Sequence, residues 1–362
     1  MKRSQVEDRL ILVALTGSHS YGLALPSSDK DYKGIFIAPS EYYIGLKSIE
    51  QKDNGWESEE GNGKFDYLGE KDTVAYELRK YLRLAAKCNP NILELLFEDP
   101  KFYTYITDKG QVLIDNKELF LSKRVRHTYA GYAHQQIKKV KTHRKWLLNA
   151  PTNAPNPVEF GLEKYEKPLS KGELNAFLEF AWMLIRDRIE YVDEEQELYT
   201  LLTERIDIKH CIHTNIPSDV MDYLQLLTRS TDDFMALLTC TQQYRKALNE
   251  WNSYKQWKKN RNKDRATLES KCGYDSKHMA HCIRLLRTGN EILLGRGVLV
   301  NREHLDASEL LEIRKGNVSY DVVEQQADFL FRELENSYKH SKLPHSVDEN
   351  SISNLCMELI TL

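Results

Sequence analysis

Several features that would assign this chain to a familiar class are missing from its sequence. No apolar run approaches the roughly 18 residues of a membrane-spanning helix. The six cysteines are scattered without a CxxC pair, which predicts reduced thiols in a cytoplasmic protein rather than a disulfide framework. The N-terminus MKRSQVEDRL leads into a short apolar run without a cleavage-like site, which argues against a secretory signal. The sequence therefore predicts a cytoplasmic protein with no membrane partner.

The sequence also lacks the motifs of several common enzyme classes, and it lacks an excess of basic residues. It contains no P-loop, GxGxxG or GxSxG segment, so the chemistries that these motifs support are not indicated. Lysine and arginine number 51 against 54 aspartates and glutamates, for a net charge of -3. Any polyanion must therefore bind to a local basic patch. The 362 residues suffice for two or three domains of about 150 residues each.

The first hundred residues differ in pattern from the rest. Apolar runs predict buried strands over Arg9–Leu15 and Tyr32–Ala38, and a third strand over Asp72–Tyr76. A helix is predicted over Leu78–Lys87, and Asn89-Pro90 is typical of the start of another. Helical periodicity dominates beyond about residue 100, in the stretches 105–148, 171–192, 217–249, 276–294 and 319–338. The predicted fold class is α+β, with a small head over residues 1–100 and a larger helical body over 101–362.

The first predicted strand ends at Gly17-Ser18, and Asp29 and Asp31 follow before the second strand. Alternate residues of a strand point to the same face, so the two aspartates are expected side by side at its start. Two carboxylates that close repel each other, and a divalent cation such as Mg²⁺ or Mn²⁺ removes the conflict. Gly17 has no Cβ and lets a phosphate approach the backbone, while Ser18 offers an N–H and a hydroxyl to an anion.

This combination resembles the nucleotidyltransferase superfamily of DNA polymerase β, whose signature is Gly-Ser, then Asp-x-Asp, then a third carboxylate on a later strand. The blocks DTVAYELRKYLRLAAKCNPNILELLF, GYAHQQIKK and YDSKHMAHCIRLLRTGNEIL make the chain similar to the YcgL/RlaP-like family of predicted nucleotidyltransferases, which is linked to RNA repair. The resemblance covers roughly residues 10–100, part of 127–145 and 271–315. It implies a polymerase-β-type catalytic head, with a mixed sheet and flanking helices, and a helical domain that completes the nucleotide and acceptor sites.

The reaction that the resemblance implies is transfer of a nucleoside monophosphate from an NTP to an acceptor hydroxyl, with release of pyrophosphate. Asp29 and Asp31 would bridge two Mg²⁺ or Mn²⁺ ions. Asp66, Asp72 and Glu77 are candidates for the third carboxylate. We favour Asp72, because the most strand-like sequence follows it, whereas Glu77 equally suits an acid in the first turn of a helix.

A second candidate site lies in the segment that begins at Tyr274. Asp275 or Ser276 can cap a helix there, and Lys277, His281 and Arg284 then fall on one face of it. Three potential cations on one stripe near a helix start suit the triphosphate of the NTP.

Basic residues interleaved with aromatic residues suggest where a nucleic acid would bind. One cluster ends a helix that starts near Arg124, and the other follows Trp251. A charged, solvated helix face is the alternative interpretation of both clusters. The candidate contacts are Tyr132, Lys138, Lys139, Trp257, Lys258 and Lys259.

We therefore expect a metal-dependent nucleotidyltransferase whose acceptor is an RNA or tRNA 3′ end. Two alternatives remain open. The acceptor hydroxyl could belong to a protein or a small molecule, or the chain could be an inactive nucleotide-binding or RNA-binding module. The preferred NTP, the use of a template and the oligomeric state are not readable from the sequence.

Overall fold

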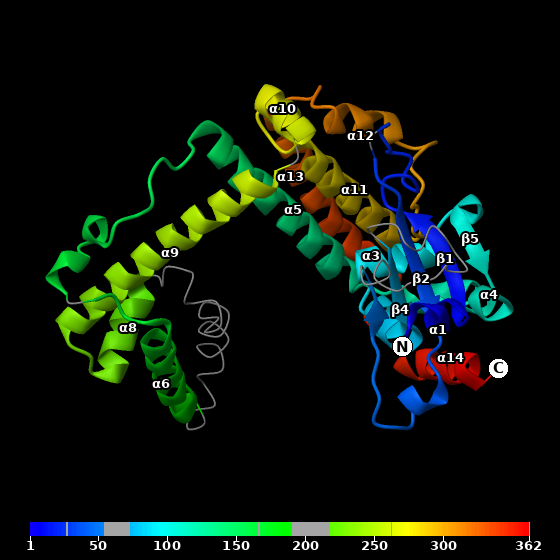
Figure 1. Cartoon of the computed structure of the whole chain (residues 1–362), viewed down its shortest axis with the longest axis horizontal. Coiled ribbons are helices and arrows are strands. Elements are labelled where there is room, and N and C mark those ends of the chain that lie inside the picture. Colours follow the sequence, from blue (N-terminus) through cyan, green and yellow to red (C-terminus); the bar gives the residue numbers. More distant parts are fainter. Residues whose placement is uncertain (27, 54–72, 166, 190–217, 262, 362) are drawn as a thin grey trace. The chain divides into compact units, whose positions relative to one another are not determined.

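A computed structural model describes the chain except residues 27, 54–72, 166, 190–217, 262 and 362 (Figure 1). The chain divides into two compact units. The first combines Met1–Leu147 with Asp264–Leu362, and the second is Leu148–Lys263. This division differs from the expected boundary near residue 100. The reason is that helices α11 (Ser276–Leu293) and α13 (Tyr320–His340) share one hydrophobic core with the N-terminal sheet.

The first unit contains a five-stranded mixed sheet in the order β3-β4-β2-β1-β5. The strand β1 lies between β2 and β5 and is antiparallel to both, and the central strand β2 runs parallel to β4. The predicted α+β class is confirmed. The fifth strand lies just beyond the expected head, where helical periodicity was predicted from residue 105. The strands are β1 (Leu10–Thr16), β2 (Asp31–Phe36), β3 (Gln51–Lys52), β4 (Val74–Glu77) and β5 (Tyr103–Ile106).

The strand β1 is apolar along its length because both faces of the sheet are covered there. Leu12 and Ala14 belong to the large core with the helices, whereas Leu10 and Val13 belong to a small core on the other face. A register irregularity between Leu10 and Leu12 adjusts the alternation of these side chains. Burial on both faces is consistent with the interior position of β1, between β2 and β5.

Most helices of the first unit cover one face of the sheet, whereas α1 contributes Val6 to the small core on the other face (Figure 1). Among the residues that the structure describes, no helix combines the length and apolarity that a bilayer crossing requires. The helices are α1 (Arg3–Glu7), α2 (Leu78–Ala86), α3 (Pro90–Leu93), α4 (Asp108–Asp115), α5 (Val125–Leu148), α10 (Lys263–Cys272), α11, α12 (Ala307–Arg314), α13 and α14 (Glu349–Thr361), with short 3-10 helices η1 (Ser40–Tyr42), η4 (Glu94–Phe97), η5 (Pro100–Phe102) and η6 (Lys117–Phe120).

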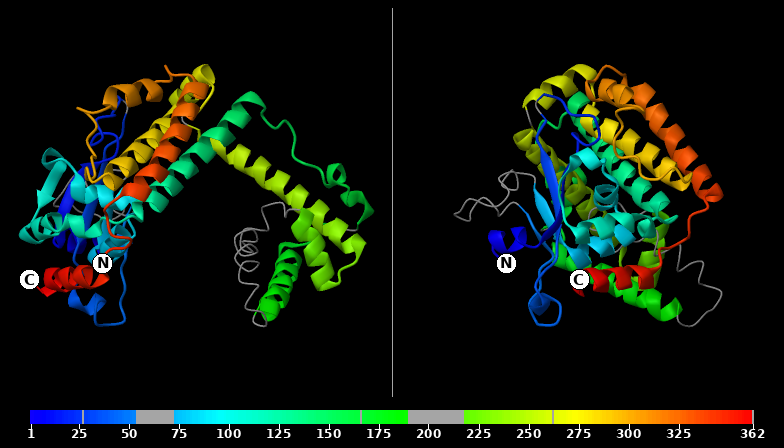
Figure 2. Two further views of the ribbon diagram at one scale, coloured as in Figure 1. Left: turned by 180° about the vertical axis from the view of Figure 1, so that it is seen from behind. Right: turned by 90° about the vertical axis from the view of Figure 1, so that its right-hand side faces the viewer.

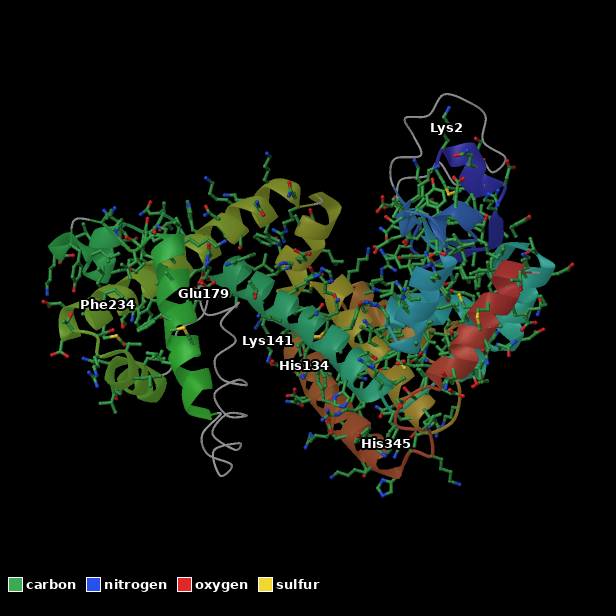
Figure 3. The ribbon with its side chains drawn as sticks, turned by 90° about the horizontal axis from the view of Figure 1, so that it is seen from below. Lys2, His134, Lys141, Glu179, Phe234 and His345 are labelled. Carbon is green, nitrogen blue, oxygen red and sulfur yellow. The ribbon has the colours of Figure 1, made fainter. Side chains whose placement is uncertain are left out.

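The helices α5, α11 and α13 run side by side in the first unit (Figures 1 and 2). Two residues of α5 mark the side that faces α13 (Figure 3). His134 stacks on Phe331 with 4.2 Å between ring centroids, and Lys141 forms an ion pair of 2.8 Å with Glu324. Part of the basic cluster predicted on α5 is therefore used inside the unit.

The described part of the second unit is helical. Its core contains Leu174, Leu178, Leu224 and Leu238, and the rings of Phe177 and Phe234 pack 5.1 Å apart. The elements are η7 (Pro157–Phe160), η8 (Leu162–Lys164), α6 (Lys171–Ile189), α8 (Ser218–Thr228) and α9 (Asp232–Asn260).

Candidate functional site

The turn that follows β1 fits closely against the first residue of β2. Gly17 has φ +73°, a conformation that favours glycine, and a Cβ built on it would overlap Oδ2 of Asp31. Thr16 pairs with Asp31 across the two strands, and the Thr16 hydroxyl donates to the Asp31 carbonyl at 3.2 Å. The glycine is therefore required by the backbone conformation and by the approach of the carboxylate.

Two backbone N–H groups of the turn take no part in the hydrogen bonds that close it within the described residues. It closes through the N–H groups of Tyr21, Gly22 and Leu23, which donate to the carbonyls of residues 17, 19 and 18 respectively. Within the described residues, the N–H groups of Ser18 and His19 have no hydrogen-bond acceptor. Successive free N–H groups after a left-handed glycine form a cradle that suits an anion such as a phosphate.

The two aspartates of the motif occupy different environments. Asp31 is half-buried at the first position of β2, whereas Asp29 is exposed and precedes the strand by two residues. The sheet therefore fixes only Asp31. Within the described part of the chain, no three His, Cys, Asp or Glu side chains gather closely enough to hold a metal ion.

The candidates for the third carboxylate have different outcomes. Asp66 and Asp72 lie outside the described residues. Glu77 is buried and caps α2, accepting hydrogen bonds from the N–H groups of Arg79 and Lys80 at 3.0 and 3.2 Å. Glu77 pairs with Phe36, at the opposite end of β2 from Asp31. Glu77 is thus the N-cap of α2, one residue before the first turn in which the alternative interpretation placed it.

Residues far along the chain hold the loop between Gly17 and Asp31. Arg314, at the end of α12, donates to the Leu23 carbonyl and, at 3.1 Å, to the Ser28 hydroxyl. His19 Nε2 lies 3.3 Å from the Ser28 carbonyl, and the Arg302 N–H donates to the Tyr21 carbonyl at 3.1 Å. The position of Asp29, one residue after Ser28, therefore depends on α12.

A buried network of charges supports the turn from below. The Ser20 hydroxyl donates to Glu98 at 2.9 Å, and the Tyr21 hydroxyl donates to Glu94 at 2.8 Å. Arg284 forms a 2.8 Å ion pair with the other oxygen of Glu94, and its guanidinium lies 3.7 Å from the centre of the Tyr21 ring. The turn is thus tied to η4, its flanking Glu98 and α11 through two carboxylates.

Burial shifts the titration of several groups in this network. It raises the pKa of Glu98 to about 8, despite the hydrogen bond from Ser20. Lys33 follows Asp31 on the same face of β2 and donates to the Asn91 carbonyl at 2.7 Å. Burial lowers the pKa of the Lys33 ammonium, against the attraction of Glu94 and Glu98. The network therefore carries less charge than its composition suggests.

The predicted stripe on α11 divides into residues with different surroundings. Of the two predicted cap candidates, Asp275 caps the helix and accepts from the His278 N–H at 3.1 Å, and Ser276 is the first helical residue. Lys277 is exposed, whereas Arg284 is buried against Glu94. Burial, followed by the nearby Arg284 charge, lowers the pKa of His281 well below its ordinary value. The stripe thus offers one exposed cation, and Arg284 contributes to the structure beneath the turn.

The candidate nucleic-acid contacts fall in both units. In the first unit, the half-buried Tyr132 accepts a hydrogen bond from Asn89 at 2.9 Å, and Lys138 and Lys139 are exposed. In the second unit, Trp257 is half-buried, with Arg261 4.5 Å from its ring centre, and Lys258 and Lys259 are exposed. Each set thus combines two exposed lysines with a half-buried aromatic side chain on the same helix.

Sequence reasoning missed the residues that support the site rather than form it. Glu94 and Glu98 sit in the apolar segment around NILELLFED, and Lys33 interrupts the apolar pattern of β2. Charged residues inside an apolar run are the signal that could have identified them, because buried charges require partners. Arg314 carried no comparable signal, since it ends an ordinary amphipathic helix.

Comparison with known proteins assigns the segment that contains the turn. Residues 1–149 match the RlaP family. This family is described as an RNA repair pathway DNA polymerase beta family. The match spans β1, the turn, β2 and the whole of the basic helix α5, and it ends before α11.

Individual relatives are similar over about the same length. An uncharacterized 38.9 kDa protein of Enterobacteria phage T4 is 28% identical over 134 residues, 36% of this chain and 38% of the relative. The uncharacterized YcgL of Bacillus subtilis is 30% identical over 130 residues, 36% of this chain and 46% of the relative. An uncharacterized protein of Methanocaldococcus jannaschii is 30% identical over 125 residues, 34% and 46% of the two chains. The chain therefore matches less than half the length of each relative. No solved structure matches significantly.

Proposed function

We propose that this protein is a nucleotidyltransferase that transfers a nucleoside monophosphate from an NTP to the 3′ hydroxyl of an RNA or tRNA during RNA repair. The acceptor oxygen would bond to the α-phosphorus, the bond to the β-phosphate would break, and pyrophosphate would leave while the hydroxyl loses its proton. The observation that carries the proposal is the Gly17-Ser18 turn, in a segment that matches the family. Gly17 lies against the Asp31 carboxylate, and the next two N–H groups have no acceptor within the described residues.

Each part of this turn has a role in the proposal. The N–H groups of Ser18 and His19 would bind phosphate oxygens of the NTP. Asp29 and Asp31 supply hard carboxylate oxygens. Because Gly17 has no Cβ, the Asp31 carboxylate can lie close to the turn that would bind the phosphate. These donors fit Mg²⁺ or Mn²⁺, with Asp72 as the proposed third ligand. Such ions, two in the proposal, would neutralise charge on the triphosphate and the leaving group.

The remaining candidates complete the proposal. Exposed Lys277 would contact the triphosphate. Arg284 would support the turn by holding Glu94 and the Tyr21 ring, and His281 would act through Arg284, from which it lies 3.5 Å away. Each unit would contribute its own RNA contacts: Tyr132, Lys138 and Lys139 on α5, and Trp257, Lys258 and Lys259 on α9.

The test is transfer of label from α-labelled NTPs to RNA with a free 3′ hydroxyl, in the presence of Mg²⁺ or Mn²⁺. We expect label in RNA with the natural protein and none with Asp29→Ala combined with Asp31→Ala. The matched control removes two exposed carboxylates of α13, through Asp321→Ala with Asp328→Ala, and should retain activity.

Digestion of the labelled products identifies the acceptor. Label that survives protease and is released by RNase supports RNA, whereas label released only by protease would replace RNA with a protein acceptor. Transfer that persists in the Asp29/Asp31 double variant would refute the assigned site.

A further inference from the structure

A basic cavity separate from the glycine turn lies in the first unit, between α2, the residue before α5, and α14. Its volume is about 410 Å³, within the range of small-molecule sites. Four cations line it: Arg79, Arg83, Lys87 and Arg124. It shares no residue with the Gly17–Asp31 turn.

The cations of this cavity are poorly neutralised by the protein itself. Glu349 is the single carboxylate among the lining residues. Arg79 is largely occupied, because it forms an ion pair of 4.0 Å with Glu77, donates to the Tyr42 carbonyl at 3.0 Å and lies over the Tyr43 ring. For Arg83 and Arg124, no acceptor is found among the residues that the structure describes, and both are exposed. With Glu349 in the lining and Glu77 paired to Arg79, the four cations leave an excess of about two positive charges.

The arrangement of these cations lowers the stability of α2. Arg79, Arg83 and Lys87 are spaced four residues apart, so they form one row of like charges along α2. Like charges at this spacing destabilise a helix. The negative C-terminal end of α2 offsets this for the last of them. It does not account for Arg124, which converges on the row from a separate segment.

The floor of the cavity differs chemically from its rim. Leu82 and Ile352 are buried beneath it, and Ala86 and Val347 complete an apolar patch. Ser346 adds a hydroxyl beside the cations. A ligand that combines a flat apolar group with a strongly anionic group matches both parts.

We propose that this cavity binds the terminal phosphate of a nucleotide, with the base on the apolar patch. A terminal phosphate carries close to two negative charges near neutral pH, whereas a diester carries one, so the excess of cations favours the terminal group. Arg83 and Arg124 supply paired donors for its oxygens. The terminal phosphate can belong to a free mononucleotide or to the 5′ end of an RNA, and both present the same chemistry. The proposal does not rest on the nucleotidyl transfer, because binding is measured without NTP turnover.

The test measures binding to the full chain by fluorescence anisotropy and calorimetry. The probes are adenosine 5′-monophosphate, a short oligoribonucleotide with a 5′ phosphate, and the same oligoribonucleotide with a 5′ hydroxyl. We expect the phosphate to tighten binding about tenfold or more over the hydroxyl. Arg83→Ala with Arg124→Ala should remove this preference. Arg332→Ala with Lys339→Ala, which removes two exposed cations from α13, should keep it.

The outcomes separate the sources of the phosphate and can overturn the site. Binding of the mononucleotide with the phosphate preference supports a small-molecule site, and binding of the 5′-phosphorylated RNA alone supports an RNA-end site. Equal affinity for the phosphate and hydroxyl probes would overturn the proposal. So would a preference that survives in an Arg83/Arg124 variant whose circular dichroism and melting temperature match those of the natural protein. Loss of label transfer in the Asp29/Asp31 variant leaves this test unaffected.

Discussion

The buried carboxyl of Glu98 makes a quantitative prediction about stability and pH. Burial raises its pKa from an ordinary value of 4.5 to about 8 in the folded protein. The folded state therefore holds this proton more tightly than the unfolded state does. Between pH 4.5 and 8 the folded state binds more protons, so this group lowers the free energy of unfolding as the pH rises.

The size of the effect follows from the shift. Each unit of pKa difference is worth about 1.4 kcal/mol, so the loss between pH 5 and pH 8 amounts to about 3 to 4 kcal/mol. Glu98→Gln keeps an oxygen that can accept from Ser20, and it cannot ionise. The other charges that face Glu98 are Glu94, Lys33 and Arg284, and they are unchanged in the variant.

The assay is urea unfolding followed by circular dichroism at pH 5 and pH 8. The natural protein should lose about 3 to 4 kcal/mol more than Glu98→Gln between these two values. The control is Glu118→Gln, which replaces an exposed glutamate and should follow the natural protein. Identical pH dependence in the natural protein and Glu98→Gln would refute the assignment of a buried, neutral carboxyl.

Two further predictions concern the turn and its support. Gly17→Ala should reduce label transfer because its Cβ displaces the Asp31 carboxylate, and it should lower the free energy of unfolding by at least about 1–2 kcal/mol because the backbone is left-handed. The control Gly131→Ala, within α5 and with open space at its Cβ, should instead raise the free energy of unfolding by up to about 1 kcal/mol. Equal melting shifts in the two variants would contradict the geometry. Arg284→Leu should lower the free energy of unfolding by about 3–5 kcal/mol, since it leaves the buried Glu94 without its ion-pair partner. Adding Glu94→Gln should restore part of this loss, as measured by urea unfolding. Strictly additive losses would argue against the ion pair.

Local sequence signals predicted the parts of the fold that depend on neighbouring residues. The strands at Leu10–Thr16 and Asp31–Phe36 follow from apolar runs that end at turn residues, and the Asn89 and Asp275 caps follow from helix-start chemistry. The boundary of the first unit could not be predicted in this way. It depends on α11 and α13 packing on a sheet about 200 residues earlier, and periodicity carries no information about which face packs on which.

In the candidate site, too, residues close in sequence could be predicted, whereas contacts between distant segments could not. Gly17, Ser18, Asp29 and Asp31 formed a pattern because they lie within fifteen residues of one another. The stripe on α11 had the correct helix but not the correct environment, since spacing does not reveal that Glu94 lies opposite Arg284. Long-range ion pairs of this kind become visible only when the chain is folded.

The bonds from Arg314 to Leu23 and Ser28 connect residues separated by 291 and 286 positions. A ribosome therefore releases the glycine turn and both aspartates long before it makes the arginine that holds their loop. A nascent chain, or a fragment cut after residue 149, would carry the motif without its brace. Translation order thus keeps the unfinished polypeptide from presenting a fully assembled centre.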